Sequence, residues 1–232
     1  MTGNRDNRAA RFEAVQRSIV DAAKLAGRNP ADITTVVVTK FQPSALVREL
    51  AARGVRNFGE SRHQEARAKA HELADLDLEW HYVGQLQTKK ARQVRSYAHV
   101  IHSIDRPSLV AALDENHDGS GLRPIGCFVQ VNLTSDAGRG GVEPARLESL
   151  VESVVSSRSL QLLGVMAIAP IDANPRAAFE QLRRESERIR KIATDATAIS
   201  AGMSNDYLDA VLEGATHLRI GTAITGNRPE AA

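Results

Sequence analysis

Cysteine is nearly absent from this chain of 232 residues, which contains a single one, Cys127. One cysteine excludes an intrachain disulfide and a zinc site made of several cysteines. The histidines show no metal-ligand spacing either. His99 and His102 lie three residues apart on a predicted strand and therefore face opposite sides of it. We expect no metal site.

Neither positive nor negative charge is in large excess. The chain has 30 Lys and Arg residues against 28 Asp and Glu, a formal net charge of +2, and only 4% of its residues are aromatic. So small a charge creates no strong field for nucleic acid, and aromatic side chains that could stack on bases are few. No apolar run is long enough for a membrane span or a signal peptide. We therefore expect a cytoplasmic protein without nucleic-acid or membrane partners.

Short β-branched runs alternate with longer amphipathic segments along the whole chain. The runs are rich in Val, Ile and Leu and are bounded by Gly, Pro, Asp or Asn, which is typical of strands. Apolar residues three or four apart, such as Phe12, Val15 and Ile19 before the first run, predict helices between them. The predicted strands cover residues 33–39, 55–58, 79–83, 99–104, 126–132, 160–168, 197–202 and 216–220.

Eight strand–helix units in a chain of this length predict an α/β fold, a single (β/α)8 TIM barrel preceded by an N-terminal helix. The alternative is an open, doubly wound sheet. Such a sheet normally uses fewer strands, and its G-x-G-x-x-G fingerprint does not follow the first predicted strand. Because no linker or shift in composition divides the chain, we expect one domain over residues 1–232, with flexible tails at about 1–7 and 227–232.

In barrels of this kind, binding and catalytic residues collect where the strands end. The first predicted strand leads directly into Lys40. Apolar walls around this amine would remove water and favour its neutral, nucleophilic form, which suits a Schiff base with a carbonyl compound. A solvated lysine that simply ends the strand fits the same position.

Glycine and hydroxyl residues follow the seventh and eighth predicted strands, where Ser204 comes after Gly202 and the pair Gly221-Thr222 comes after Arg219. Glycine lets the backbone approach a ligand, and N–H and hydroxyl groups donate to anions, so these turns favour a phosphate site. Helix capping by Ser204 is the alternative. Arg219 lies among apolar residues and needs a fixed acceptor, which could be a carboxylate or a ligand atom with a lone pair.

Phosphate donors, a desolvated lysine and an inward-facing arginine together describe a site for pyridoxal 5′-phosphate (PLP). Several motifs in order across the chain resemble those of the pyridoxal phosphate homeostasis proteins, whose barrel is related to that of alanine racemase. These motifs are VVVTK (36–40), RNFGE (56–60), WHYVGQLQ (80–87), HSID (102–105), VQVN (129–132), GVMAIAP (164–170), AGMSND (201–206) and THLRIGTAITG (216–226).

The resemblance implies a role for individual residues. Lys40 matches the lysine that holds PLP as an internal aldimine, and Arg219 matches the arginine that faces the pyridine nitrogen. Ser204, Gly221 and Thr222 match the phosphate cradle. The motifs imply that four more residues belong to the same site, Met203, Met166, His81 and Ser61.

Ser61 is a departure from the resemblance, because the family usually has Asn at this position. Serine is shorter and offers one hydroxyl, so a contact that the Asn makes to the cofactor or its water is not assured here.

The resemblance further implies a protein of intracellular PLP homeostasis that holds the cofactor without robust catalytic activity. A cation at the pyridine nitrogen disfavours protonation of the ring and so weakens it as an electron sink. In alanine racemases a Tyr of an additional domain supplies a second base, and we expect no such group here. We expect a monomer, with PLP-dependent enzymes as possible recipients of the cofactor.

Two alternatives stay open. One is a PLP-dependent amino-acid racemase of low activity. The other is a barrel enzyme without PLP, in which Lys40 makes a Schiff base with a sugar phosphate.

Overall fold

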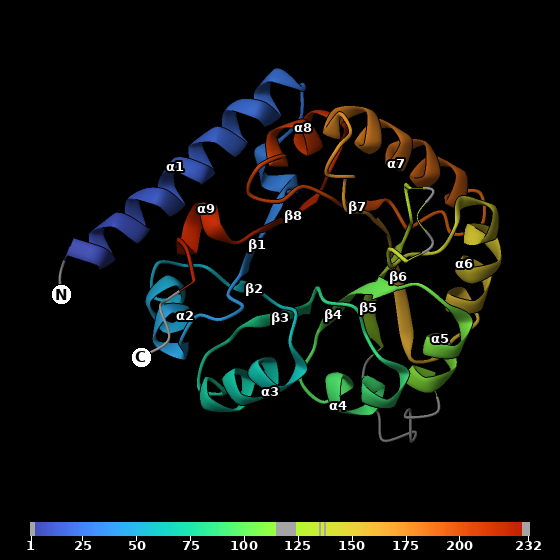
Figure 1. Ribbon diagram of the computed structural model, residues 1–232, viewed down its shortest axis with the longest axis horizontal. Coiled ribbons are helices and arrows are strands. Elements are labelled where there is room, and N and C mark those ends of the chain that lie inside the picture. The colour runs from blue at the N-terminus through green and yellow to red at the C-terminus, as the bar shows by residue number, and fades with distance from the viewer. Residues whose placement is uncertain (1–2, 115–123, 135, 137, 229–232) are drawn as a thin grey trace.

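A computed structural model describes residues 3–114, 124–134, 136 and 138–228 of the chain (Figure 1). The strands are β1 (Thr34–Val38), β2 (Asn57–Glu60), β3 (Glu79–Tyr82), β4 (Val100–Ile104), β5 (Ile125–Gln130), β6 (Leu160–Met166), β7 (Ala198–Ser200) and β8 (His217–Ile220). The helices are α1 (Gly3–Leu25), α2 (Ser44–Ala51), α3 (His63–Glu72), α4 (Ala91–Arg95), α5 (Pro107–Asp114), α6 (Leu147–Val155), α7 (Pro175–Ile189), α8 (Tyr207–Leu212) and α9 (Thr222–Thr225).

The eight strands form a closed parallel barrel in sequence order, and β8 pairs with β1 to complete it. Figure 1 shows the helices as an outer ring around the strands. The prediction of a (β/α)8 barrel preceded by a helix is therefore confirmed. All eight predicted strands are present, and their ends lie within two residues of the predicted ones.

Local turns explain two of these differences. The second strand begins at Asn57 rather than at residue 55, because the N–H of Val55 donates to the carbonyl of Leu50 and closes the turn after α2. The seventh strand ends at Ser200 rather than at residue 202, because Gly202 has φ +87° and turns the chain out of the sheet. Both departures come from turns, which strand propensity alone does not describe.

The main core lies between the barrel wall and the helices. The stripe of α7, which includes Phe179, Leu182 and Ile189, is buried against the sheet. Full burial of side chains of this size stabilises the fold by about 1.5–3 kcal/mol each. Among the described residues, no helix has both the length and the apolar character that crossing a membrane would require.

Helix α1 lies outside the ring and packs on α8 and α9 (Figure 1). Two arginines of this N-terminal segment fasten it, since Arg11 donates to the carbonyl of Ile224 and Arg28 donates to that of Val211. Of the tails expected at 1–7 and 227–232, residues 1–2 and 229–232 lie outside the described residues, and α1 begins at Gly3.

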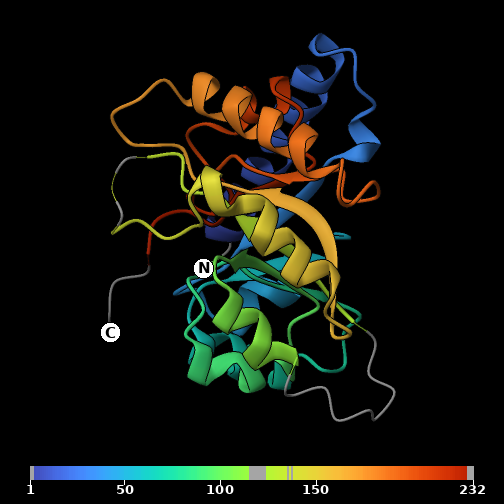
Figure 2. The ribbon, with the colours of Figure 1, turned by 90° about the vertical axis from the view of Figure 1, so that its right-hand side faces the viewer.

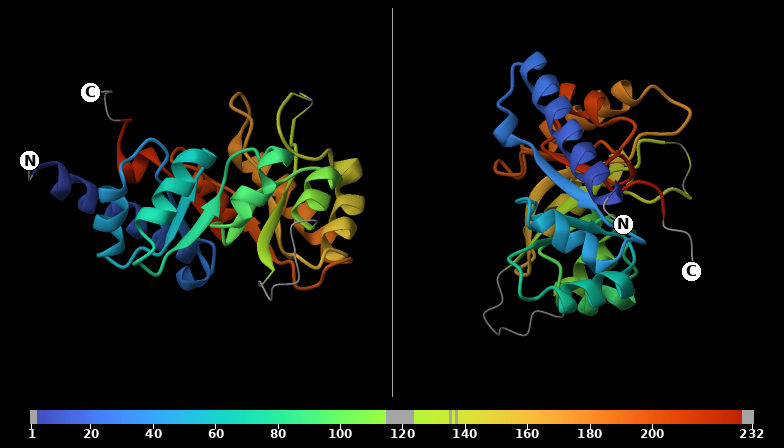
Figure 3. Two further views of the ribbon diagram at one scale, coloured as in Figure 1. Left: turned by 90° about the horizontal axis from the view of Figure 1, so that it is seen from below. Right: turned by 90° about the vertical axis from the view of Figure 1, so that its left-hand side faces the viewer.

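The carboxyl ends of the parallel strands define one end of the barrel. The loop after β6 and the segment after α9 project from this end, as the side views in Figures 2 and 3 show. The amino ends of the strands and the preceding loops lie at the opposite end. Residues that follow strands are thus gathered on a single face of the molecule, as the barrel topology requires.

Candidate functional site

A cavity of about 500 Å³ opens at the carboxyl end of the barrel, between the ends of β1, β2, β7 and β8 and the loop after β6. Its size is in the range of small-molecule sites. Apolar side chains such as Ile168 and Pro170 form one wall. Seven of the nine residues predicted for the site line it, namely Lys40, Ser61, Met203, Ser204, Arg219, Gly221 and Thr222.

Lys40 is placed at the rim of this cavity by a tight turn after β1. The N–H of Gln42 donates to the carbonyl of Thr39, and Phe41 inside the turn has φ +64°, which is uncommon for a residue with a side chain. The carboxylate of Glu65 accepts from the N–H of Phe41 at 3.0 Å and holds this conformation. Backbone strain of this kind is typical of functional sites.

The expectation of a desolvated Lys40 is wrong for the structure, in which its side chain is exposed. The reason is its place one residue beyond the buried strand, where the protein does not enclose the amine. The apolar residues that precede it, such as Val38, are themselves buried in the barrel.

A buried ion pair supports the backbone beneath Lys40. The ammonium of Lys69 donates to Glu60 Oε1 at 2.6 Å and to the carbonyl of Thr39 at 2.7 Å, while the Thr39 hydroxyl donates to the same carboxylate oxygen. Burial raises the pKa of Glu60, while Lys69 and Thr39 act in the opposite direction. Sequence reasoning missed this pair, because it forms between the end of a strand and a neighbouring helix.

The turns after β7 and β8 meet at the amino end of α9. Gly221 precedes this short helix, and Ser204 Oγ accepts from the N–H of Ala223 at 3.1 Å. A Cβ at Gly202 would lie 2.9 Å from Tyr207 Cα, so only glycine fits the turn that brings Ser204 here. Backbone N–H groups and hydroxyls thus converge where the sequence predicts a phosphate cradle.

Arg219 is buried at the cavity with neutral partners. Its Nη1 donates to Ser200 Oγ at 2.6 Å and its Nη2 donates to the carbonyl of Ala167 at 2.9 Å. Burial lowers the pKa of Arg219 to about 10, and Asp206 opposes this shift, so the guanidinium stays charged at neutral pH. Among the described residues no carboxylate pairs with it directly. A ligand atom with a lone pair is therefore the better of the two predicted acceptors.

Ser61 lies between this cavity and a neighbouring polar hollow of about 360 Å³. The Tyr82 hydroxyl donates to the Ser61 carbonyl at 3.4 Å. The backbone of Gly84 packs directly on that of Ser61, since a Cβ at Gly84 would lie 2.3 Å from the Ser61 oxygen. This contact fixes the loop, but the structure gives the Ser61 hydroxyl no polar partner among the described residues.

Two predicted site residues do not line the cavity. Met166 is buried at the end of β6, where it is paired with Gln130 and Ser200 in the sheet. His81 lies on β3 inside the barrel, where it contacts His102 and Asn57. Met166 and His81 therefore lie behind the residues that line the cavity.

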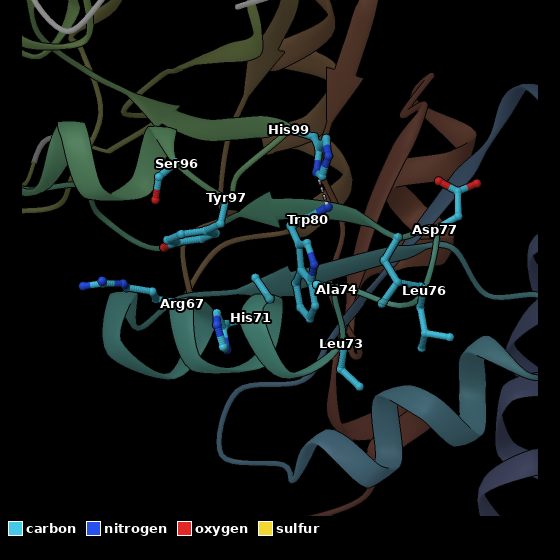
Figure 4. Close-up of a pocket in the computed structure, with 12 residues that line it drawn as sticks. Arg67, His71, Leu73, Ala74, Leu76, Asp77, Trp80, Ser96, Tyr97 and His99 are labelled. Carbon is cyan, nitrogen blue, oxygen red and sulfur yellow. Dashed lines mark hydrogen bonds between the residues drawn. The ribbon is translucent and has the colours of Figure 1, made fainter.

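A second cavity, of about 460 Å³, lies away from the carboxyl end (Figure 4). Trp80, Tyr97 and His71 of α3 line it, and the backbone N–H of Trp80 donates to His99 Nδ1 at 2.9 Å. Trp80 and His99 lie near the amino ends of their strands, so this cavity does not share residues with the predicted site.

Comparisons with known proteins identify the class to which this fold and site belong. The sequence matches the family described as alanine racemase, N-terminal domain, over residues 14–229. The pyridoxal phosphate homeostasis protein of Mycobacterium leprae is 40% identical, over 97% of this chain and 95% of its own length. That of Escherichia coli is 33% identical, over 92% and 94%. The chain therefore belongs to the pyridoxal phosphate homeostasis protein family.

Solved structures agree with this assignment. The structure of PipY from Synechococcus elongatus with PLP bound matches with a TM-score of 0.79 and 37% identity, over 90% of this chain and all of that one. Alanine racemase from Corynebacterium glutamicum matches with a TM-score of 0.66 over 95% of this chain and 62% of its own. At 16% identity, the second likeness concerns the fold alone.

Proposed function

We propose that this protein binds PLP in the cavity at the carboxyl end of the barrel, holds it as an imine on Lys40, and serves PLP homeostasis rather than rapid turnover. One observation carries this proposal. A lysine amine, the amino end of α9 and a buried arginine that has no carboxylate partner in the described part of the chain all line a single cavity of about 500 Å³. The PLP bound to the related PipY supports the same conclusion.

The donor set of the cavity fits this cofactor. PLP supplies an aldehyde that an amine can capture and a pyridine ring that can delocalise negative charge. The neutral Lys40 amine would bond to the carbon of such an aldehyde, and the aldehyde oxygen would leave as water with the two amine hydrogens to give the imine. The Ser204 hydroxyl with the backbone of Gly221 and Thr222 suits a phosphate group, and the Arg219 guanidinium suits the lone pair of a pyridine nitrogen.

The cavity offers few proton carriers for chemistry on a bound amino acid. Among the described residues that line it, the titratable side chains are Lys40, Asp206 and Arg219. The Asp206 carboxylate accepts from the Met203 N–H at 2.6 Å, and Arg219 stays protonated at neutral pH. A racemase needs a base on each face of its substrate, so this set favours holding the cofactor over turnover.

The test is a visible absorption spectrum after addition of PLP and dialysis. We expect wild type to keep a yellow imine band and Lys40→Ala to lose it. The matched control is Lys191→Ala, because Lys191 is an exposed lysine that does not line the cavity, and this variant should keep the band. A wild-type protein that retains no PLP would overturn the proposal and favour the sugar-phosphate alternative.

Loss of α-deuterium from labelled amino acids tests the absence of turnover. Exchange no faster than with free PLP agrees with a holding role. Exchange that is much faster and disappears in Lys40→Ala would favour the low-activity racemase instead.

Release to other proteins is part of the proposed role, because water can reverse imine formation. PLP-dependent enzymes are the proposed recipients. Loaded protein mixed with an apoenzyme of this class should restore its activity, whereas the Lys40→Ala variant treated in the same way should not.

A further inference from the structure

A row of polar side chains crosses the interior of the barrel behind Arg219. His81 Nε2 lies 2.9 Å from Asn57 Oδ1, and His81 Nδ1 lies 2.9 Å from His102 Nε2. His102 Nδ1 lies 2.8 Å from Ser200 Oγ, which accepts from Arg219 Nη1 at 2.6 Å. These five residues come from five different strands, and His81, His102, Ser200 and Arg219 are buried. The row therefore connects the far side of the barrel with the cavity.

The two ends of the row set the direction of its hydrogen bonds. A guanidinium only donates, so Ser200 Oγ accepts from Arg219 and gives its own proton to His102 Nδ1. Neutral His102 then carries its proton on Nε2 and donates to His81 Nδ1. Neutral His81 in turn donates from Nε2 to Asn57 Oδ1. Every polar atom of the row that faces a neighbour has a partner in this arrangement.

The opposite direction leaves a buried group without a partner. If His102 Nδ1 donated to Ser200 Oγ, that oxygen would accept twice and its own proton would have no acceptor among the described residues. A buried donor without an acceptor costs about 1–3 kcal/mol. The arrangement that runs from Arg219 to Asn57 is therefore preferred.

Both histidines of the row are neutral. Burial, with smaller effects of His217 and His99, lowers the pKa of His81 to about 3. Burial also lowers the pKa of His102 well below its ordinary value, and His81, Arg219 and His217 contribute. Each imidazole therefore has one N–H and one lone pair, as the row requires.

We propose that Ser200, His102, His81 and Asn57 are positioning residues that fix the Arg219 guanidinium at the cavity without neutralising it. The hydroxyl of Ser200 cannot rotate away, because His102 holds its proton. A carboxylate in this place would pair with the arginine and reduce its attraction for the lone pair of a ligand. The inference rests on the proposed cofactor site, since it assigns Arg219 to the pyridine nitrogen.

Imidazole NMR of the protein without PLP tests the row itself. We expect the signals of His81 and His102 to show the Nε2–H form and to stay unchanged between about pH 5 and 9, a range that includes the ordinary midpoint for histidine. Signals from the Nδ1–H form, or a midpoint near the ordinary value for either residue, would overturn the proposed direction. This readout does not depend on cofactor binding, so it separates the row from the proposed function.

Replacement of Ser200 tests the consequence for the cofactor. Ser200→Ala should weaken PLP binding about tenfold, the effect of one hydrogen bond to a charged group, and should shift the pH midpoint of the visible band. Ser200→Thr keeps the hydroxyl and should restore both values. The control is Ser103→Ala, because Ser103 is equally buried and its hydroxyl has no partner among the described residues.

The outcomes distinguish the two claims. A wild-type protein that binds PLP, with Ser200→Ala unchanged in affinity and in the pH midpoint, would refute the positioning role and leave the proposed function intact. A wild-type protein that binds no PLP would refute the proposed function, while the NMR result would still decide whether the row exists. An equal loss of binding in Ser103→Ala would show a general packing effect and would also count against the proposal.

Discussion

Arg219 and Lys69 are both buried cations near the carboxyl end of the barrel, but their partners differ. Arg219 donates to a hydroxyl and a carbonyl, whereas Lys69 lies against the Glu60 carboxylate. Burial of a charge is costly unless a partner compensates, so an arginine with neutral partners points to a ligand that supplies the missing acceptor. Lys69 instead supports the backbone on which Lys40 is carried.

Replacement of Lys69 should show how much the buried Glu60 carboxylate destabilises the fold when it has no cation beside it. Lys69→Met leaves Glu60 buried and without its cation, and we expect a loss of about 3–5 kcal/mol in the free energy of unfolding near neutral pH. Without Lys69 only burial and weaker contacts act on Glu60, so its folded-state pKa rises further above the unfolded value. Protonation removes the buried charge, so the deficit should shrink as pH falls. Urea unfolding at several pH values measures it.

The control for this prediction is Lys191→Met on the surface. It should change the free energy of unfolding by less than about 0.5 kcal/mol at every pH, as most surface substitutions do. A deficit in Lys69→Met that stays constant with pH would contradict the assignment of the cost to ionised Glu60.

At the scale of elements, the turn between β7 and α8 determines where Ser204 lies. Gly202 has φ +87°, and a Cβ there would lie 2.7 Å from Ala210 Cβ. We expect Gly202→Ala to lower the free energy of unfolding by about 2–5 kcal/mol, because backbone strain and a steric clash add. We also expect Gly202→Ala to lose more PLP affinity than variants that leave this turn unchanged.

Gly54→Ala is the matched control for that prediction. Gly54 also has a positive φ, +92°, but a Cβ there would meet nothing within 4 Å. Its cost should therefore be the backbone term alone, about 1–2 kcal/mol. Equal losses in the free energy of unfolding for the two variants would show that the steric clash with α8 does not add to the cost of Gly202→Ala.

Helix α1 is the element that fastens α9 from outside the barrel. Because Arg11 donates to the carbonyl of Ile224 at 3.0 Å, Arg11→Ala should loosen α9 and weaken PLP binding about three- to tenfold, the effect of a partly exposed hydrogen bond. Hydrogen exchange of residues 222–225 should become faster. Arg17→Ala is the control, because Arg17 is exposed and its ion pair among the described residues is with Glu13 on the same helix. Unchanged exchange in both variants would contradict the role of Arg11.

The elements show what the sequence could and could not predict. Periodicity located all eight strands, because β-branched runs and helix stripes are local patterns. It could not place His81 and Met166 behind the cavity wall, since strand sequence does not tell which residue reaches the mouth and which stays in the interior. The ion pair of Glu60 with Lys69, and the row from Arg219 to Asn57, depend on contacts between elements and have no local signature.

For the whole molecule, closure of the barrel by β1 and β8 joins the two ends of the site. Lys40 follows β1, while Arg219 lies on β8 and the cradle residues Gly221 and Thr222 come directly after it, so they become neighbours of Lys40 only in the closed form. Ligand bound across this seam should stabilise the complete fold. PLP at about 100 times its dissociation constant should add about 2.7 kcal/mol to the free energy of unfolding.

Thermal unfolding with increasing PLP measures this effect. The midpoint should rise with concentration in wild type, and the rise should be much smaller in Lys40→Ala. No rise in wild type would mean that PLP does not bind the native state in preference to the unfolded one.

Chemical reduction followed by peptide mapping tests the central claim most directly. Borohydride converts an imine between PLP and a lysine into a stable amine, and mass spectrometry then locates the modified residue. The account predicts the label on Lys40, at close to one per chain, with its loss in Lys40→Ala. A label on other lysines such as Lys89 or Lys191, or an equal label in Lys40→Ala, would contradict it.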